Sequence, residues 1–190
     1  MPFIVFLAFA YIILSNFALK GIYFMEFSNS KRNLNLSAYL RKRPNAEATL
    51  VGDELHSSLR GVVRLYETTY GTLVVVSVSG LPLSTERCRK GIFALHMHSG
   101  PSCTGNSSDP FANVGMHYNP NSCMHPYHSG DMPPLFSSNG NAFLAFITDR
   151  FSVDEAIGKA IVIHDSYDDF SSQPSGNSGN KIACGIIIKI

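Results

Sequence analysis

Histidines gather in the second half of this sequence at spacings that suit metal binding. Six of the seven histidines, with one aspartate among them, fall in four short segments. These segments are His96-Met97-His98, Gly115-Met116-His117-Tyr118-Asn119-Pro120, His125-Pro126-Tyr127-His128-Ser129-Gly130-Asp131 and Ile161-Val162-Ile163-His164. Neutral imidazole is a borderline-soft nitrogen donor that binds copper and zinc readily near neutral pH. The segments therefore predict that the chain binds metal ions.

The number of donors predicts more than one ion. Structural zinc takes about four ligands in a tetrahedron, and copper in a tetragonal field takes about four nitrogens. The donors of these segments are seven residues: His96, His98, His117, His125, His128, Asp131 and His164. They complete two four-coordinate sites only if one histidine is shared. The sequence therefore predicts two metal ions side by side.

Each segment also has a simpler interpretation when it is taken alone. Residues i and i+2 of a strand face the same side, so His96 and His98 can bind one ion, or they are two hydrogen-bonded surface histidines. His164 ends an apolar run, where a lone histidine is more often a satisfied core residue. The segment 125–131 spaces its donors at i, i+3 and i+6, which suits a zinc site or else a polar surface loop.

A carboxylate follows His164 four residues later in the chain. Asp168 could accept N–H bonds from ligands of both metals and so fix their tautomers. A solvated turn is the simpler interpretation of this segment. Asp165 or Asp169 could also serve in place of Asp168.

Short apolar segments between turn residues predict an all-β domain. We expect strands at about 48–55, 60–66, 72–79, 91–98, 141–149, 159–164 and 182–189. Glu67–Gly71 predicts a five-residue hairpin loop, and Ser152–Ile157 predicts one helical turn capped by Ser152. About eight such strands indicate a Greek-key β-sandwich or flattened barrel. The excursions 99–140 and 165–180 are the two long loops expected to carry function.

The first 45 residues differ in character from the rest of the chain. Residues 1–24 are hydrophobic, and their apolar run at 3–19 suits a signal peptide or a membrane tether. Residues 25–45 read as a basic linker, and residues 46–190 as the folded domain. We expect export or membrane anchoring. The alternative is a cytoplasmic protein, because basic residues follow the apolar run and translation could start at Met25.

Composition and cysteine spacing exclude some functions. The net charge is +1 and no basic stripe with interleaved aromatic residues occurs, so nucleic-acid binding is not expected. The four cysteines include no C-x-x-C pair, which argues against a zinc ribbon. A disulfide between Cys103 and Cys184 would pin the loop after the first histidines to the last strand, whereas a reducing compartment would favour two buried thiols. Cys88 and Cys123 have no assignment.

The order of these motifs resembles the copper/zinc superoxide dismutases, in a bacterial-type form. The shared pattern is H-x-H, G-x-H-Y-N-P, H…H-x-G-D, V-x-H-x-x-x-D-D and a closing G-N-x-G-x-K-I-A-C-G. It runs from about Ala46 to Ile190 and is dense from Phe93 onward. The resemblance implies copper and zinc as cofactors and superoxide as the substrate, and it allows a homodimer.

Carried over residue by residue, the resemblance implies a role for each donor. The copper ligands would be His96, His98, His117 and His164, and the zinc ligands His117, His125, His128 and Asp131. His117 would bridge the two ions, and Asp168 would link their ligands through hydrogen bonds. Cys103 and Cys184 would form the family's intrasubunit disulfide.

The implied activity is the disproportionation of superoxide to dioxygen and hydrogen peroxide. His117 and Lys181 are the expected catalytic residues, the first as a proton carrier and the second as an attractor of the anion. Lys181 stands where the family has an arginine, so attraction should survive while orientation weakens. The loop 170–180 contains no charged residue, where many relatives carry charges that steer superoxide. We therefore expect a lower and less salt-dependent rate.

A second class of function remains open at this point. A non-catalytic copper- or zinc-binding protein of the same fold, acting as a buffer or metal donor, would tolerate lysine at position 181. The complete set of four copper donors argues against it. A purely structural sandwich domain would leave all seven donors unexplained.

Overall fold

The computed structural model describes residues 35–85, 88 and 91–190, so the hydrophobic segment 1–24 lies outside the described residues. The chain divides into two compact units, Met1–Lys42 and Arg43–Ile190. In the first unit α2 (Leu36–Leu40) forms within the expected linker, because the Asn35 side chain caps it by accepting from the Ala38 amide. Across the described part of the chain, no helix is long and apolar enough to cross a membrane.

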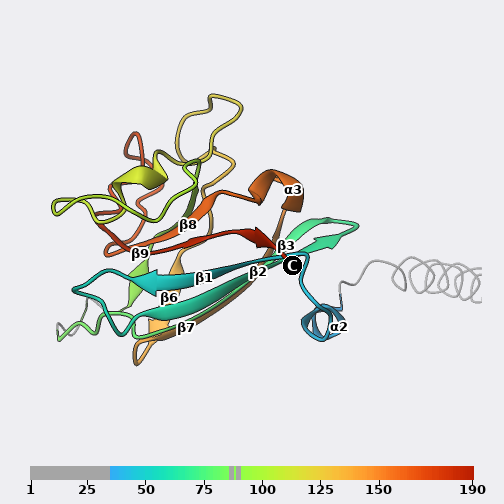
Figure 1. The fold of residues 1–190 in the computed structure, drawn as a ribbon, viewed down its shortest axis with the longest axis horizontal. Helices are drawn as coiled ribbons and strands as arrows, with labels where there is room; N and C mark the ends of the chain where they lie inside the picture. The colour runs from blue at the N-terminus through green and yellow to red at the C-terminus, as the bar shows by residue number, and fades with distance from the viewer. Residues whose placement is uncertain (1–34, 86–87, 89–90) are drawn as a thin grey trace, which may run out of the picture. The chain divides into compact units, whose positions relative to one another are not determined.

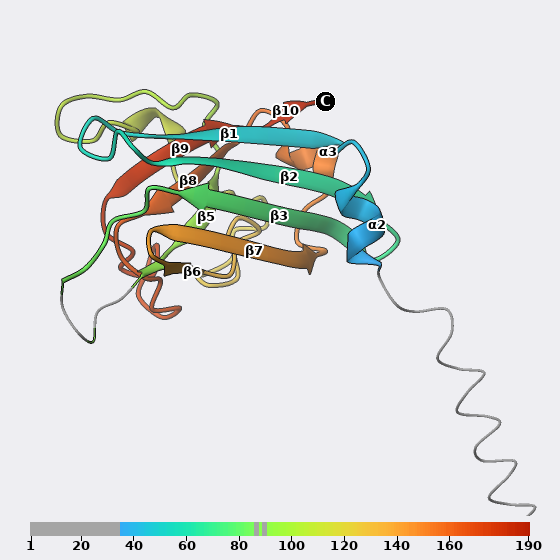
Figure 2. The ribbon, with the colours of Figure 1, turned by 90° about the horizontal axis from the view of Figure 1, so that it is seen from below.

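The second unit is built from antiparallel strands. They are β1 (Ala46–Gly52), β2 (Arg60–Thr68), β3 (Gly71–Ser79), β4 (Ile92–Phe93), β5 (Leu95–His98), β6 (Leu135–Ser138), β7 (Asn141–Thr148), β8 (Ala160–His164), β9 (Lys181–Ile186) and β10 (Ile188–Lys189). They pair in the order β4-β6-β7-β3-β2-β1-β9-β8-β5, with β10 beside β1. Figure 2 looks onto the layer formed by β1, β2, β3 and β7. The expected all-β fold class is confirmed.

The sheet closes on itself at Ala94. This single residue separates β4 from β5, which stand at opposite ends of the strand order. The Ala94 amide donates to the Ser166 carbonyl at 2.7 Å, and the Ala94 carbonyl accepts from the His164 amide at 3.0 Å. One continuous segment thus pairs with β6 before Ala94 and with β8 after it. The result is a flattened barrel.

Alternation of inward and outward residues fills the barrel. In β1, Ala46, Ala48 and Leu50 are fully buried, whereas Thr49 and Val51 are exposed. β5 and β8 differ, because they are buried along their whole length. Their core side carries Leu95, Met97, Ile161 and Ile163, and their other side carries His96, His98 and His164. Loops cover this second side.

Two long loops lie over β8 on the same side of the barrel (Figure 1). The first joins β5 to β6 and contains one 3-10 turn, η1 (Ala112–Val114), and the second joins β8 to β9. The predicted helical turn is confirmed as α3 (Val153–Ala156), where Ser152 and Glu155 form a capping box. The first of these loops brings its donor residues beside β5.

Two local predictions were wrong. The excursion 99–140 contains β6, which pairs with the short β4. The hairpin loop has two residues instead of five, because Thr68 pairs with Gly71. Gly71 has a φ of +114°, a conformation that glycine adopts without steric cost and that lets the strands turn sharply.

Candidate metal centre

Strand pairing positions the first donors. His96 and His98 alternate with Leu95 and Met97 in β5, whose register places His96 opposite Val162 of β8. His164 ends β8. The first long loop folds back along β5 through two isolated bridges, His96 with Asp131 and His98 with His117. Donors that are far apart in the sequence therefore meet beside one strand.

The structure brings one group of four histidines together. His96, His98, His117 and His164 are all buried, and their donor atoms lie within 4.8 Å of one another. The closest pair of rings is His96 and His117, whose centroids are 3.9 Å apart. This is the group expected to hold copper.

One nitrogen of each of these histidines has no protein partner. Among the described residues, Nδ1 of His96 and Nε2 of His98, His117 and His164 are buried and accept or donate no hydrogen bond. A buried polar atom without a partner costs free energy of about 1–3 kcal/mol. Four such atoms converging on one point are therefore explained by a ligand that they all bind, and a copper ion fits this nitrogen set.

The opposite nitrogens fix the tautomers. His98 Nδ1 lies 2.8 Å from the Gly115 carbonyl, and His164 Nδ1 lies 3.4 Å from the Gly179 carbonyl. His96 Nε2 lies 2.8 Å from a carboxylate oxygen of Asp168. Carbonyl and carboxylate oxygens only accept, so these ring nitrogens donate and leave the other nitrogen with its lone pair free.

Burial keeps the rings of His96, His98 and His164 neutral. It lowers the pKa of His98 to about 3, and neighbouring imidazoles add to this effect. It also lowers the pKa of His96, and it lowers the pKa of His164 well below the usual value. A neutral imidazole is the form that binds a metal, so no proton has to leave at neutral pH.

A second group shares His117 with the first. His117, His125, His128 and Asp131 are buried, and their donor atoms also lie within 4.8 Å of one another. His117 Nδ1 lies 2.7 Å from Asp131 Oδ1. Nδ1 of His125 and Nδ1 of His128 lie 3.0 and 3.3 Å from Asp131 Oδ2. Three imidazoles and one carboxylate form a ligand set suited to tetrahedral zinc.

Asp168 connects the two groups. Its Oδ2 accepts from His96 Nε2 at 2.8 Å and its Oδ1 from His125 Nε2 at 2.9 Å. Burial alone would raise the pKa of Asp168, but hydrogen bonds from His96, the Phe170 amide and His125 lower it to about 2. Asp165 instead binds Asn180, and Asp169 accepts from Ser171 and Ser172. Of the three carboxylates considered from the sequence, Asp168 is the one that contacts donors of both groups.

A cavity of about 560 Å³ opens onto the first group. His98, His117 and His164 form part of its lining, and Lys181 lies in its wall. The sequence analysis missed two of its features. Asp109 pairs with Lys181, and His56, the one histidine outside the two groups, lies at the cavity with its Nδ1 2.7 Å from Asp53 Oδ1.

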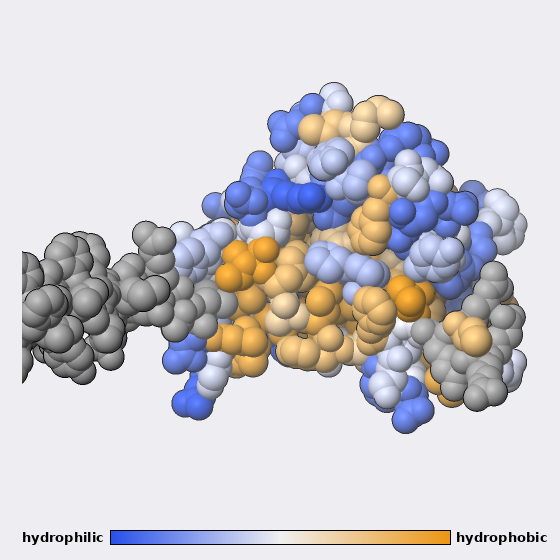
Figure 3. Space-filling model, turned by 180° about the vertical axis from the view of Figure 1, so that it is seen from behind, coloured by the Kyte–Doolittle hydropathy of each residue, from blue (hydrophilic) through white to orange (hydrophobic). Residues whose placement is uncertain are grey.

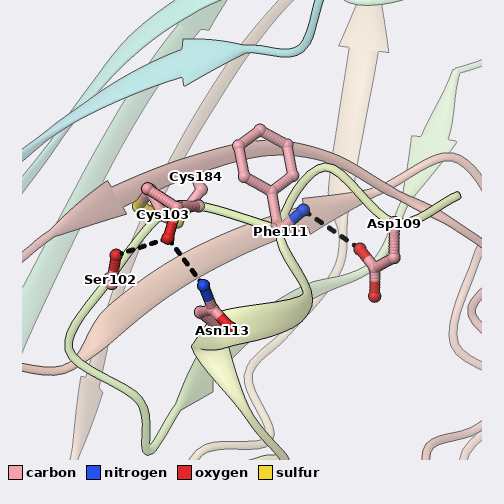
Figure 4. The surroundings of a disulfide bond; sticks show 7 residues. Ser102, Cys103, Asp109, Phe111, Asn113 and Cys184 are labelled. Atoms are coloured by element: carbon pink, nitrogen blue, oxygen red, sulfur yellow. Dashed lines mark hydrogen bonds between the residues drawn. A yellow bond between two sulfur atoms is a disulfide. The ribbon is translucent and has the colours of Figure 1, made fainter. Parts of the chain in front are cut away.

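The expected disulfide is present. Cys103 and Cys184 are bonded, with their Cα atoms 5.6 Å apart (Figure 4). The bond ties the first long loop to β9, and Asn113 steadies the loop by donating to Thr104 at 2.8 Å. Cys88 and Cys123 are free and exposed.

Arg150 is a further residue that the sequence analysis missed. Its Nη1 lies 3.1, 3.4 and 3.3 Å from the carbonyl oxygens of Pro126, His128 and Asp131. One guanidinium thus holds the backbone of the loop that supplies three donors of the second group. No local signal in the sequence indicates this contact.

The fold and the paired donor groups define a two-metal protein on a β-barrel, and comparisons place it in a family. A family model described as copper/zinc superoxide dismutase matches residues 59–187. Superoxide dismutase (Cu-Zn) 2 of Aquifex aeolicus is 31% identical over 169 residues, which is 81% of this chain and 92% of the relative. The Legionella pneumophila superoxide dismutase (Cu-Zn) is 32% identical over 139 residues, which is 67% of this chain and 76% of the relative.

Solved structures agree with this result. A double mutant of a SOD-like protein from Bacillus subtilis superposes with a TM-score of 0.62 at 25% identity, over 75% of this chain and 96% of that one. The Cu/Zn superoxide dismutase of Brucella abortus gives 0.61 at 22% identity, over 74% and 98%. The chain belongs to the copper/zinc superoxide dismutase family.

Proposed function

We propose that this protein is an oxidoreductase that converts two superoxide anions and two protons into dioxygen and hydrogen peroxide. One observation carries the proposal. Among the described residues, four buried histidine nitrogens without protein partners lie within 4.8 Å of one another, and three of these histidines line a cavity whose wall contains Lys181. Family membership supports the same activity.

The residues divide into two ligand sets. His96, His98, His117 and His164 would hold copper through the unpartnered nitrogens. His117, His125, His128 and Asp131 would hold zinc, so that His117 is shared. When bound, copper supplies a one-electron couple that can take an electron from one superoxide and return it to the next.

The protein contributes attraction, orientation and a proton. Lys181 offers positive charge in the cavity wall to an incoming anion. His117 can hold a proton at Nε2 whenever that atom is not bound to a metal, and it can donate the proton to the peroxide product. Asp168 keeps His96 and His125 in fixed tautomers. Of this donor set, the cavity is lined by His98, His117 and His164. A small anion can therefore reach these ligands while the other ligands stay shielded from solvent.

Superoxide consumption by protein loaded with copper and zinc tests the proposal. We expect activity that depends on copper, and a lower rate in Lys181→Ala with a shallower dependence on ionic strength, because the attracting charge is lost. Binding of both metals without superoxide consumption would favour the alternative, a non-catalytic metal buffer or donor.

A homodimer is part of the proposal. Ile92 of β4 pairs with Phe136 of β6, and these side chains are 38% and 69% exposed. Phe143 of β7, the other strand that pairs with β6, is also exposed. Apolar residues also gather across the middle of one face of the molecule (Figure 3). Light scattering should give twice the mass of one chain. If the exposed side chains of Ile92, Phe136 and Phe143 join two copies, Phe136→Ser should lower the measured mass.

We also propose that the protein works outside the reducing cytosol, exported or tethered to a membrane through residues 3–19. The Cys103–Cys184 disulfide supports this, because such bonds persist in oxidising compartments. Cell fractionation with N-terminal sequencing tests the proposal. A cytoplasmic protein that begins at Met25 would contradict it.

A further inference from the structure

Lys181 does not stand free in the cavity wall. Its Nζ forms an ion pair with Asp109 Oδ2 from the first long loop. Both side chains are partly covered, with exposed fractions of 19% for Lys181 and 36% for Asp109. Among the described residues that line the cavity, Lys181 is the only lysine or arginine. The single fixed positive charge available to an anion is therefore already paired.

Asp109 is held firmly at this position. Its other oxygen, Oδ1, accepts from the Phe111 amide at 3.0 Å (Figure 4). The disulfide joins the same loop to Cys184, which is three residues beyond Lys181 in β9. Burial alone would raise the pKa of Asp109, yet the hydrogen bonds from Lys181 and Phe111 hold it below its usual value. The carboxylate is therefore charged at neutral pH.

The rest of the cavity does not restore a positive field. Asp53 and Asp165 also line it, and His56 is hydrogen-bonded to Asp53. Asp109, Lys181 and His98 line the same cavity, so the ion pair lies beside the proposed copper site. An anion entering here meets a lysine whose charge is offset by a carboxylate.

We propose that Asp109 is a positioning residue that holds the Lys181 ammonium and limits the attraction of anions to the copper site. The inference rests on the proposed function, since the anion concerned is the substrate. Removing the Asp109 charge should release Lys181 and strengthen anion capture. Steering by charge changes association rates by about 10- to 1000-fold in total, so one charge should account for a rise of about threefold to tenfold at low ionic strength.

Asp109→Asn tests the inference because it keeps the size of the side chain and its bond to Phe111 while removing the charge. In the copper- and zinc-loaded protein, we expect azide, a small monoanion that binds copper, to bind about threefold to tenfold more tightly by visible absorption. The superoxide rate should rise by a similar factor, with a steeper fall as salt is added. Unchanged or weaker azide binding in Asp109→Asn would overturn the inference.

Two controls separate charge from structure. Asp154→Asn removes one negative charge outside the cavity lining and should leave azide affinity within about twofold of the parent, because exposed charges are screened by salt. Lys181→Ala combined with Asp109→Asn should abolish the gain. If the gain persists without Lys181, Asp109 does not act through that lysine.

The azide measurement also keeps this inference distinct from the proposed function. A parent protein that binds copper but consumes no superoxide contradicts the proposed function, whereas azide affinity still reports on the pairing of Lys181. Tighter azide binding in Asp109→Asn would then support the role of Asp109 in an anion site without catalysis.

Discussion

At the scale of single residues, each histidine of the first group pairs one nitrogen with the protein and leaves the other without a partner among the described residues. His98 donates through Nδ1 to a backbone carbonyl, and His96 donates through Nε2 to Asp168. The unpartnered nitrogens are therefore oriented before any ion arrives. Such preparation lowers the cost of ordering the ligands when a metal binds.

Asp168 should matter to both metals. Asp168→Ala removes the acceptor of His96 and His125, and loss of such a partner typically weakens metal binding by about 10- to 100-fold. Competition with chelators should show weaker binding of copper and of zinc. Asp169→Ala is the matched control, because Asp169 contacts serines of its own loop. Equal metal affinities in the two variants would show that Asp168 does not contribute to metal binding.

At the scale of secondary-structure elements, the loop from β5 to β6 is held at two separate places. Arg150 binds three carbonyls of its 125–131 segment, and the disulfide holds its earlier part against β9. The zinc donors and Asp109 therefore depend on contacts that lie outside their own segments.

Arg150→Gln should weaken zinc binding by about tenfold or more, because the carbonyls that orient the donor loop lose their shared donor. Zinc affinity measured against a chromophoric chelator checks this. Arg64→Gln provides the control, since Arg64 pairs with Glu47 on the barrel strands. If Arg150→Gln and Arg64→Gln bind zinc equally well, the contacts of Arg150 with the loop carbonyls are unimportant for zinc binding.

Loss of the disulfide should destabilise the domain by roughly 2–5 kcal/mol. The bond closes a loop between residues 81 positions apart, so it restricts the unfolded chain strongly. Denaturant unfolding of Cys184→Ser should show this change, whereas Cys88→Ser should match the parent because Cys88 is free and exposed. Parental stability in Cys184→Ser would contradict the structural role of the bond.

Sequence patterns predicted those elements whose signals are local. The H-x-H of β5 follows from the two-residue period of a strand, and the capping box of α3 is readable within four residues. By contrast, β6 is a four-residue strand that follows two prolines, and one of its two partner strands, β4, lies far away in the chain. The pair of Asp109 with Lys181 spans 72 positions, so only the folded chain reveals it.

At the scale of the whole molecule, the buried histidines make stability depend on pH. The pKa of His98 is lowered to about 3, and those of His96 and His164 are lowered too. Unfolded histidines titrate near pH 6.5, so below that pH the unfolded chain binds more protons than the folded chain. The stability of the metal-free protein is therefore highest above about pH 6.5 and falls as the pH drops toward 3.

Thermal unfolding of the metal-free protein checks this linkage. The melting temperature should fall by about 5 °C or more between pH 7 and 4, equivalent to roughly 2 kcal/mol for a domain of this size. His98→Asn removes one of the three groups, so its melting temperature should fall less steeply. A melting temperature that stays constant over this range would contradict the buried, neutral state of the histidines.

The central claim is that two metal ions share His117, and metal content after reconstitution tests it most directly. We expect one copper and one zinc per chain in the parent. In His117→Ala both should be lost or weakened, because its Nε2 belongs to one donor group and its Nδ1 lies in the other. In His128→Ala, zinc should be lost while copper stays, because His128 belongs to the second group alone. Full copper and zinc content in His117→Ala would contradict the shared site.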